Sequence, residues 1–329
     1  MAHTLLGKPG QVVTWLTYVL LLYSLMAAYL SGGGAIVTSS INSVWHTHLG
    51  ELWGPVPWML IVGGIIYIGV ANVDRFNRLL MLGLIVAYVL LVIIAAPHIH
   101  AKNFYHHNSK QLFWALPVVI TSFGYHVIIP SLRGYLKSDT GRLKKIIFFG
   151  SLLPLLTYLV WEIIVFGLIP LQGPGGLIAI FHAGQPANML TQSIAQFTAS
   201  GVVIWAAKAF VFFAIASSFL GIAFSLPDFV ADGFSIKKTP IGRIFIIALT
   251  FIPPFVFVWL FPKGFILALS FAGVFVAILH GFLPALMAYK ARQKGLATYK
   301  APGGNVMLIL IAMFSALIIV SQILLRMVH

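Results

Sequence analysis

Long apolar stretches separated by short polar loops dominate the pattern of this chain. A helix that crosses the hydrocarbon core of a bilayer needs about 20 mostly apolar residues. No polar cluster between the apolar stretches is long enough for a soluble domain, so the pattern predicts one membrane domain over residues 1–329. The predicted class is an all-α polytopic membrane protein of about nine transmembrane helices. The expected spans lie near 12–36, 55–73, 79–96, 112–132, 146–169, 199–225, 244–261, 265–288 and 305–325.

Composition and charge agree with this class. Hydrophobic residues make up 60% of the 329 residues and charged residues 8%, whereas a soluble domain is about half apolar and about a quarter charged. The formal charge of +14 does not indicate a nucleic-acid partner, because the basic residues are dispersed among short loops.

The absence of cysteine excludes disulfides, thiolate catalysis and thiolate metal sites. The first apolar segment is long enough to span the bilayer, so no cleavable signal peptide is predicted.

The distribution of basic residues predicts an orientation. With the N-terminus in the cytoplasm, most lysines and arginines fall in cytoplasmic loops, and this bias is the positive-inside signature. The exceptions are Lys208, which falls inside a span, and an outside set of Lys102, Lys110, Lys263 and Arg326. Two outside loops are long, 97–111 and 170–200. The second contains a short apolar run that we expect to form a surface helix or a gate.

One predicted span is interrupted in its middle by "TSFGYH", residues 121–126. Gly124 permits the backbone to leave the helix, the flanking residues supply hydroxyls, an aromatic wall and an imidazole, and Pro130 weakens the hydrogen bonding of the second half. Membrane transporters use such discontinuous helices to bind substrate at exposed half-helix ends. A Pro-kinked helix with a packed glycine is the alternative, and the residues alone do not separate the two.

Ionisable side chains inside spans are costly and mark function by default, and two of them stand out. Glu162 lies in "LLTYLVWEIIVFGL" and Lys208 in "GVVIWAAKAFVFF", both toward the outer half. A buried ion pair, or a Lys208 that extends to the outer interface, is one interpretation, and a proton-titrating Glu162 is the other. The adjacent hydroxyls of Ser217 and Ser218 are a further candidate, although serines in membrane helices also bond simply to their own backbone.

The 97–111 loop supplies four histidines: His98, His100, His106 and His107. They raise the hypothesis of a metal-binding membrane protein, which lacks supporting cysteine or carboxylate ligands. No nucleotide-binding loop, metalloprotease motif or nucleophile–base–acid set occurs in the sequence. The sequence therefore predicts neither an enzyme nor a cofactor or metal site.

Four segments together resemble a known family. "GKPGQVVTWLTYVLLLYSLMAAYLSGGG", "LPVVITSFGYHVIIPSLRGYL", "LLPLLTYLVWE" and "SSFLGIAFSLPDF" occur in the order seen in the hydroxy/aromatic amino acid permeases, the tyrosine- and tryptophan-specific transporters of bacteria. The resemblance implies proton-coupled import of an aromatic amino acid, most closely tyrosine, across the bacterial inner membrane. It also implies two inverted five-helix repeats with a cytoplasmic N-terminus.

The resemblance assigns candidate site residues and reveals a departure. The match begins at the third family span, so the fold would be truncated by two helices, including the first broken one. A transport-inactive fragment of a permease is therefore the alternative function. The stretch from Tyr29 to Gly34 would line the site. The substrate site would comprise Thr121, Ser122, Phe123, Gly124, Tyr125 and His126, and proton coupling would involve Glu162, Lys208, Ser217 and Ser218.

Overall fold

The computed structural model describes residues 2–328 except 49, 51–52, 69, 106–108, 126–128, 137–138, 183–185, 199, 238 and 297–301. Over this part of the chain, helices joined by loops make up the fold, and no strand occurs. The α-helices are α1 (Ala2–Trp45), α2 (Pro55–Ile68), α3 (Val70–Ala95), α4 (Ser109–Thr121), α5 (Ile129–Tyr135), α6 (Thr140–Leu168), α7 (Leu177–His182), α8 (Pro186–Thr198), α9 (Gly201–Gly233), α10 (Pro240–Leu260), α11 (Phe265–Val276), α12 (Leu283–Gln293) and α13 (Gly304–Val328). Short helical turns η1 (Ala96–His98), η2 (Ala101–Tyr105) and η4 (Ala277–Phe282) complete the fold.

Seven helical segments in the described residues are long and apolar enough to cross a membrane. They coincide with seven of the nine expected spans, and α11, η4 and α12 act together as one of them. The other two expected spans contain shorter apolar helices, Pro55–Ile65 and Leu112–Thr121. The multi-pass helical class is therefore confirmed, whereas the count of nine spans stays a prediction.

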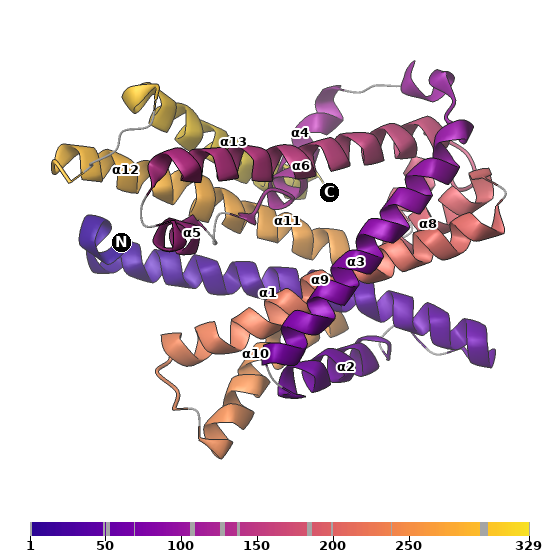
Figure 1. Cartoon of the computed structure of the whole chain (residues 1–329), viewed down its shortest axis with the longest axis horizontal. Helices are drawn as coiled ribbons and strands as arrows, with labels where there is room; N and C mark the ends of the chain where they lie inside the picture. The colour runs from indigo at the N-terminus through magenta and orange to yellow at the C-terminus, as the bar shows by residue number, and fades with distance from the viewer. Residues whose placement is uncertain are drawn as a thin grey trace.

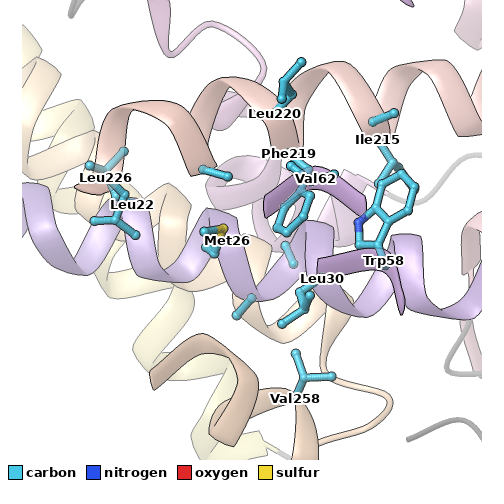
Figure 2. Packing of buried hydrophobic residues seen from close by; sticks show 14 of the residues in the cluster. Leu22, Met26, Leu30, Trp58, Val62, Ile215, Phe219, Leu220, Leu226 and Val258 are labelled. Carbon is cyan, nitrogen blue, oxygen red and sulfur yellow. The ribbon is translucent and has the colours of Figure 1, made fainter. Parts of the chain in front are cut away.

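The main hydrophobic core lies where α1 contacts α9 and α2. Figure 1 shows α1 running along the molecule, with α3 crossing it in this view and α9 behind. Figure 2 shows Met26 and Leu30 of α1 close to Phe219 of α9 and Trp58 of α2. Phe219 and Met26 are both 0% exposed, so α1 is held firmly at the level of its middle turns.

A second core joins α3, α6, α8 and α9. Its members include Leu91 of α3, Ile164 of α6 and Val203 of α9. In the 170–200 loop, the short helix α7 confirms the helical run expected there, and α8 was not anticipated. Ile194 of α8 is 2% exposed and belongs to this core. The loop is therefore partly built into the protein rather than lying wholly on its surface.

One span boundary differs from its prediction. Arg75 and Arg78 were expected in a loop between two spans, but both lie within α3, which begins at Val70. Arg78 pairs with Asp74 at 2.8 Å, one helical turn away on the exposed surface. The two arginines therefore belong to the first turns of α3 and not to a loop. The spacing of the ion pair agrees with this, because residues four apart are neighbours on a helix surface.

Prolines inside the spanning helices leave backbone carbonyls without their usual partners. Pro253 in α10 has no amide hydrogen to donate to the carbonyl of Leu249, four residues earlier. The Tyr23 hydroxyl of α1 donates to that carbonyl at 2.7 Å. An apolar environment makes an unpaired carbonyl costly, so this contact both satisfies α10 and fastens it to α1.

The helix that precedes the expected break is docked tightly on α11. Gly273 of α11 lies directly against Pro117 of α4, and a β-carbon at residue 273 would overlap the Pro117 carbonyl oxygen. Close backbone approach through a small residue is typical of membrane helix pairs. This contact fixes where α4 ends relative to α1 and α11.

Candidate functional site

The predicted interruption of the fourth span is present in the structure. Helix α4 ends at Thr121, and residues 122–124 continue as tight turns in which each amide donates to the carbonyl three residues earlier. Helix α5 resumes at Ile129. His126 and its two successors lie outside the described residues, so the imidazole expected at this site stays a prediction.

Gly124 and Pro130 have different roles from those expected. The φ of Gly124 is not in the left-handed region, so its conformational freedom is not what this position uses. A β-carbon there would lie 3.1 Å from the Thr121 carbonyl oxygen, and glycine therefore relieves crowding at the helix end. Pro130 is the second residue of α5, where a missing amide hydrogen costs nothing.

Two residues of α6 hold the interrupted segment in place. The Tyr158 hydroxyl donates to the Ser122 carbonyl at 3.1 Å, and its ring meets the Phe123 ring edge-on with centroids 5.6 Å apart. The Tyr125 hydroxyl hydrogen-bonds the Ser151 hydroxyl, which in turn donates to the Ile147 carbonyl at 2.7 Å. Backbone released from a helix is tolerated at membrane depth only where protein or a cavity surrounds it, and α6 supplies the protein.

A cavity of about 470 Å³ opens beside the break. Its volume is in the range of sites that enclose small molecules. The polar lining comes from the break and from two tyrosines, while aliphatic and phenyl groups of α1 and α11 form the remainder. The lining residues are Leu21, Leu25, Tyr29, Thr121, Ser122, Gly124, Tyr125, Tyr158, Phe265, Leu269 and Val276.

The electrostatic character of this cavity is set by backbone and hydroxyl groups. None of the described residues that line it is charged. The carboxyl end of α4 faces it, and a helix carboxyl end carries partial negative charge. The Thr121 hydroxyl donates to the Val118 carbonyl at 2.5 Å, which leaves its oxygen lone pairs available. The cavity is therefore suited to a molecule without net charge that has an apolar body, one cationic group and one group that accepts hydrogen bonds.

Tyr29 connects this cavity to the paired serines of α9. Ser218 and Tyr158 are both among its polar neighbours. Ser217 instead donates to the Ala214 carbonyl at 3.2 Å, within its own helix. Of the two predicted hydroxyls, only Ser218 reaches the cavity lining. Beyond Tyr29, the glycines up to Gly34 pack closely against α2 and Phe265, so Tyr29 is the residue of this stretch that lines the cavity.

Glu162 and Lys208 are placed at similar levels on neighbouring helices but are not joined. Trp161 and Phe210, which adjoin them in sequence, contact each other with ring centroids 4.8 Å apart. Both ionisable side chains are exposed, and within the described structure no ion pair connects them. The Lys208 ammonium instead lies 5.8 Å from the Trp205 ring centroid. Neither residue lines the cavity, although Glu162 is one helical turn beyond Tyr158.

The histidines of the 97–111 loop are not arranged as a metal site where the structure describes them. The His98 and His100 rings contact the carbonyls of Ile94 and His98 through Nδ1, at 3.1 and 2.6 Å. His106 and His107 lie outside the described residues. Among those that are described, no group of three or more potential ligands occurs anywhere in the chain.

Several lining residues were not predicted. Tyr158, Phe265 and Val276 reach the cavity only because α6 and α11 fold against the break. Tyr158 could have been noticed in the sequence, because it lies one helical turn before the candidate Glu162 and therefore on the same face of the helix. Phe265 and Val276 belong to uniformly apolar sequence, and no sequence feature distinguishes them as lining residues.

Comparison with known proteins identifies the family to which this fold and cavity belong. The model of the tryptophan/tyrosine permease family matches residues 1–322. The chain belongs to the tryptophan/tyrosine permease family. Membership places it among transporters rather than enzymes and confirms the resemblance drawn from the four sequence segments.

Relatives of this permease are named for tyrosine or tryptophan transport, and the chain spans about four fifths of their length. A tyrosine-specific transport system of Haemophilus influenzae is 32% identical, over 97% of this chain and 79% of the relative. A tryptophan-specific transport protein of the same organism is 31% identical over 97% and 79%. A tryptophan-specific transport protein of Pseudomonas aeruginosa is 32% identical over 98% and 79%. No solved structure gives a significant match.

Proposed function

We propose that this permease imports an aromatic amino acid, tyrosine above the others, together with protons across the bacterial inner membrane. The observation that carries the proposal is the cavity of about 470 Å³ at the interrupted helix, lined by hydroxyls and apolar side chains. Relatives named for tyrosine and tryptophan transport support the substrate class. The proposal includes nine spans, the five-plus-five inverted-repeat arrangement and a cytoplasmic N-terminus.

The substrate pose follows from the chemistry of the cavity. The α-ammonium group would lie at the carboxyl end of α4, where the helix dipole is negative. The Tyr29 hydroxyl would donate to the α-carboxylate. The aromatic ring would lie against Leu25, Phe265 and Val276, where burial of apolar surface stabilises the complex by about 25 cal/mol per Å².

The coupling residues remain those proposed from sequence. Glu162 is the proton-linked group of this proposal, with Lys208 at the same level as its partner in a state where α6 and α9 come closer together. Ser218 supports the role of the paired serines, because it is a neighbour of Tyr29, which lines the cavity. Ser217 and His126 stay in the proposal because they adjoin Ser218 and Tyr125, respectively, in the sequence.

Uptake of labelled tyrosine tests the proposal directly. The chain is expressed in cells that lack their own aromatic amino acid permeases, and uptake is compared at two external pH values. We expect faster uptake at the lower pH, with competition by unlabelled tyrosine. Tryptophan and phenylalanine serve as competitors to rank the substrates. If the chain is shown to reach the membrane and no aromatic amino acid enters, the transport proposal is wrong and the inactive-fragment alternative holds.

A further inference from the structure

The helical stretch Phe265–Gln293 contains a turn of unusual geometry. Between α11 and α12, residues Ala277–Phe282 form the π-helical turn η4, inside a helical stretch long enough to cross a membrane. Turns of this kind are rare and occur frequently at functional sites. His280 lies within η4, and its Nδ1 atom is shielded from solvent. An imidazole at this depth is unusual because ionisable groups in spans are costly.

The local sequence explains why the helix changes its hydrogen bonding here. Pro284 follows His280 by four residues and has no amide hydrogen to give to the His280 carbonyl. The Leu283 amide donates instead to the Ile278 carbonyl, five residues earlier, which is the π pattern. The irregular turn is therefore encoded by "HGFLP", residues 280–284.

The His280 side chain borders a cavity of about 400 Å³ between η4, α4 and α13. Most of the lining is apolar: Ile120, Val276, Leu310, Ile311 and Phe314. The hydroxyl of Ser315 also lines it and donates to the Ile311 carbonyl at 2.8 Å. A β-carbon at Gly281 would overlap the Ser315 oxygen, so glycine lets α13 bring this hydroxyl against η4. An imidazole and a hydroxyl thus share an otherwise apolar space.

This second cavity adjoins the proposed substrate cavity. Val276, the last residue of α11, lines both. On the other side, Ile120 lines the His280 cavity and the next residue, Thr121, lines the substrate cavity. A change in the shape of η4 would therefore act on a wall of the substrate cavity and on the end of α4.

We propose that His280 is a second proton-binding site, whose protonation changes the shape of the substrate cavity through η4 and Val276. The proposal rests on the transport function proposed above and adds a residue to its coupling. Histidine is suited to this role because its ordinary titration lies between about pH 5 and about pH 8.

The surroundings of His280 set the direction of the effect. A hydrophobic cluster that includes Leu279 of η4 adjoins the cavity. Among the described side chains of this cluster, Tyr18 of α1 is the titratable residue. The cations Lys290 and Arg292 are in the last turn of α12, remote from the cavity. No charged side chain lines the cavity in the described structure. An ionised ring is unfavourable in such a space unless water enters, so protonation favours a more open η4 and the neutral ring favours the compact form.

The first test uses the absence of cysteine from the chain. Ser122→Cys places a single thiol at the substrate cavity for an environment-sensitive fluorophore, and emission of the purified, labelled permease is recorded between about pH 5.5 and about pH 7.5. We expect the emission to change with pH in this variant and to lose that change when His280→Gln is added. His182→Gln, the same substitution at an exposed position of α7, serves as the matched control and keeps the response.

This measurement needs no transport, so it separates the two proposals. An unchanged pH response in the His280→Gln variant overturns the inference, even if tyrosine uptake is demonstrated. Conversely, loss of the response supports it even if tyrosine is not the substrate. Ser315→Ala is a second variant for the case in which His280→Gln does not fold. It removes the hydroxyl neighbour and is expected to shift the midpoint of the response, and an unmoved midpoint counts against the site.

Discussion

At the scale of single residues, tyrosine hydroxyls satisfy backbone carbonyls throughout this protein. Tyr23 donates to Leu249, Tyr88 donates to Thr157 at 2.9 Å and Tyr158 donates to Ser122. Each bond joins segments that are distant in sequence. An aromatic ring with a polar end suits this purpose, because its ring packs among apolar groups while the hydroxyl reaches the backbone.

Tyr158→Phe tests whether the bond to the Ser122 carbonyl shapes the substrate site. A neutral hydrogen bond contributes about 0.5–1.5 kcal/mol, so we expect a rise of about two- to tenfold in the KM for tyrosine uptake. Tyr88→Phe removes a bond of the same type away from the cavity and should leave KM within about twofold. Equal effects of the two substitutions would show that the Ser122 contact has no special role.

Glu162→Gln tests the proposed proton-linked group. The substitution keeps the shape of the side chain and removes its titration, so uptake should lose its acceleration at low external pH. Lys208→Gln is the companion variant, because the proposal pairs the two residues. Retention of the full pH dependence in Glu162→Gln, measured with labelled tyrosine in the same cells, would rule this residue out.

At the scale of elements, the sequence predicts apolar helices well and irregular ones unevenly. The interruption after Thr121 was predictable, because Gly124 and the polar residues around it are out of place in a lipid-facing helix. Helix α8 was not, since its residues are largely polar and its apolar face becomes visible only when Ile194 packs on α9. The π turn at His280 had a signal, namely a proline four residues later, but a single proline predicts a kink as readily.

The cavity itself lies beyond what the sequence predicts. Its polar half is the interrupted segment, which the pattern identified, and its other half is Leu21, Leu25 and Phe265. These three are indistinguishable in sequence from the many apolar residues that face lipid. Which apolar residues line a cavity depends on how α1 and α11 pack on α4, and this is tertiary information.

Gly273→Ala tests the docking of α4 on α11. A methyl group at residue 273 would overlap the Pro117 carbonyl, and forced overpacking typically costs about 1–3 kcal/mol. We expect a clear fall in the thermal unfolding temperature of the purified permease. Gly150→Ala in α6 is the matched control, since a β-carbon there meets no atom within 4 Å. A fall of equal size in both variants would show that the α4–α11 contact is not the cause.

At the scale of the whole molecule, the distribution of basic residues makes orientation testable. Single cysteines replace the exposed Lys145 and Lys263, which the positive-inside pattern places on opposite sides of the membrane. In intact cells, a membrane-impermeant maleimide should label residue 263 and should label residue 145 only after permeabilisation. The opposite pattern would reverse the proposed topology.

Helix α1 is much longer than the bilayer requires. After Gly7, where the backbone leaves the helical region (φ 74°), residues 8–45 extend for about 57 Å at about 1.5 Å per residue. Met26 is fully buried close to the middle of this rod, and Tyr29 of the cavity wall is one turn further along. A rocking motion of about 10° about Met26 would displace each end by about 5 Å and move Tyr29 by less than about 1 Å. In the transport cycle proposed above, such a rotation about Met26 would move the two ends of α1 in opposite directions while the contacts of Tyr29 with the substrate stay nearly unchanged.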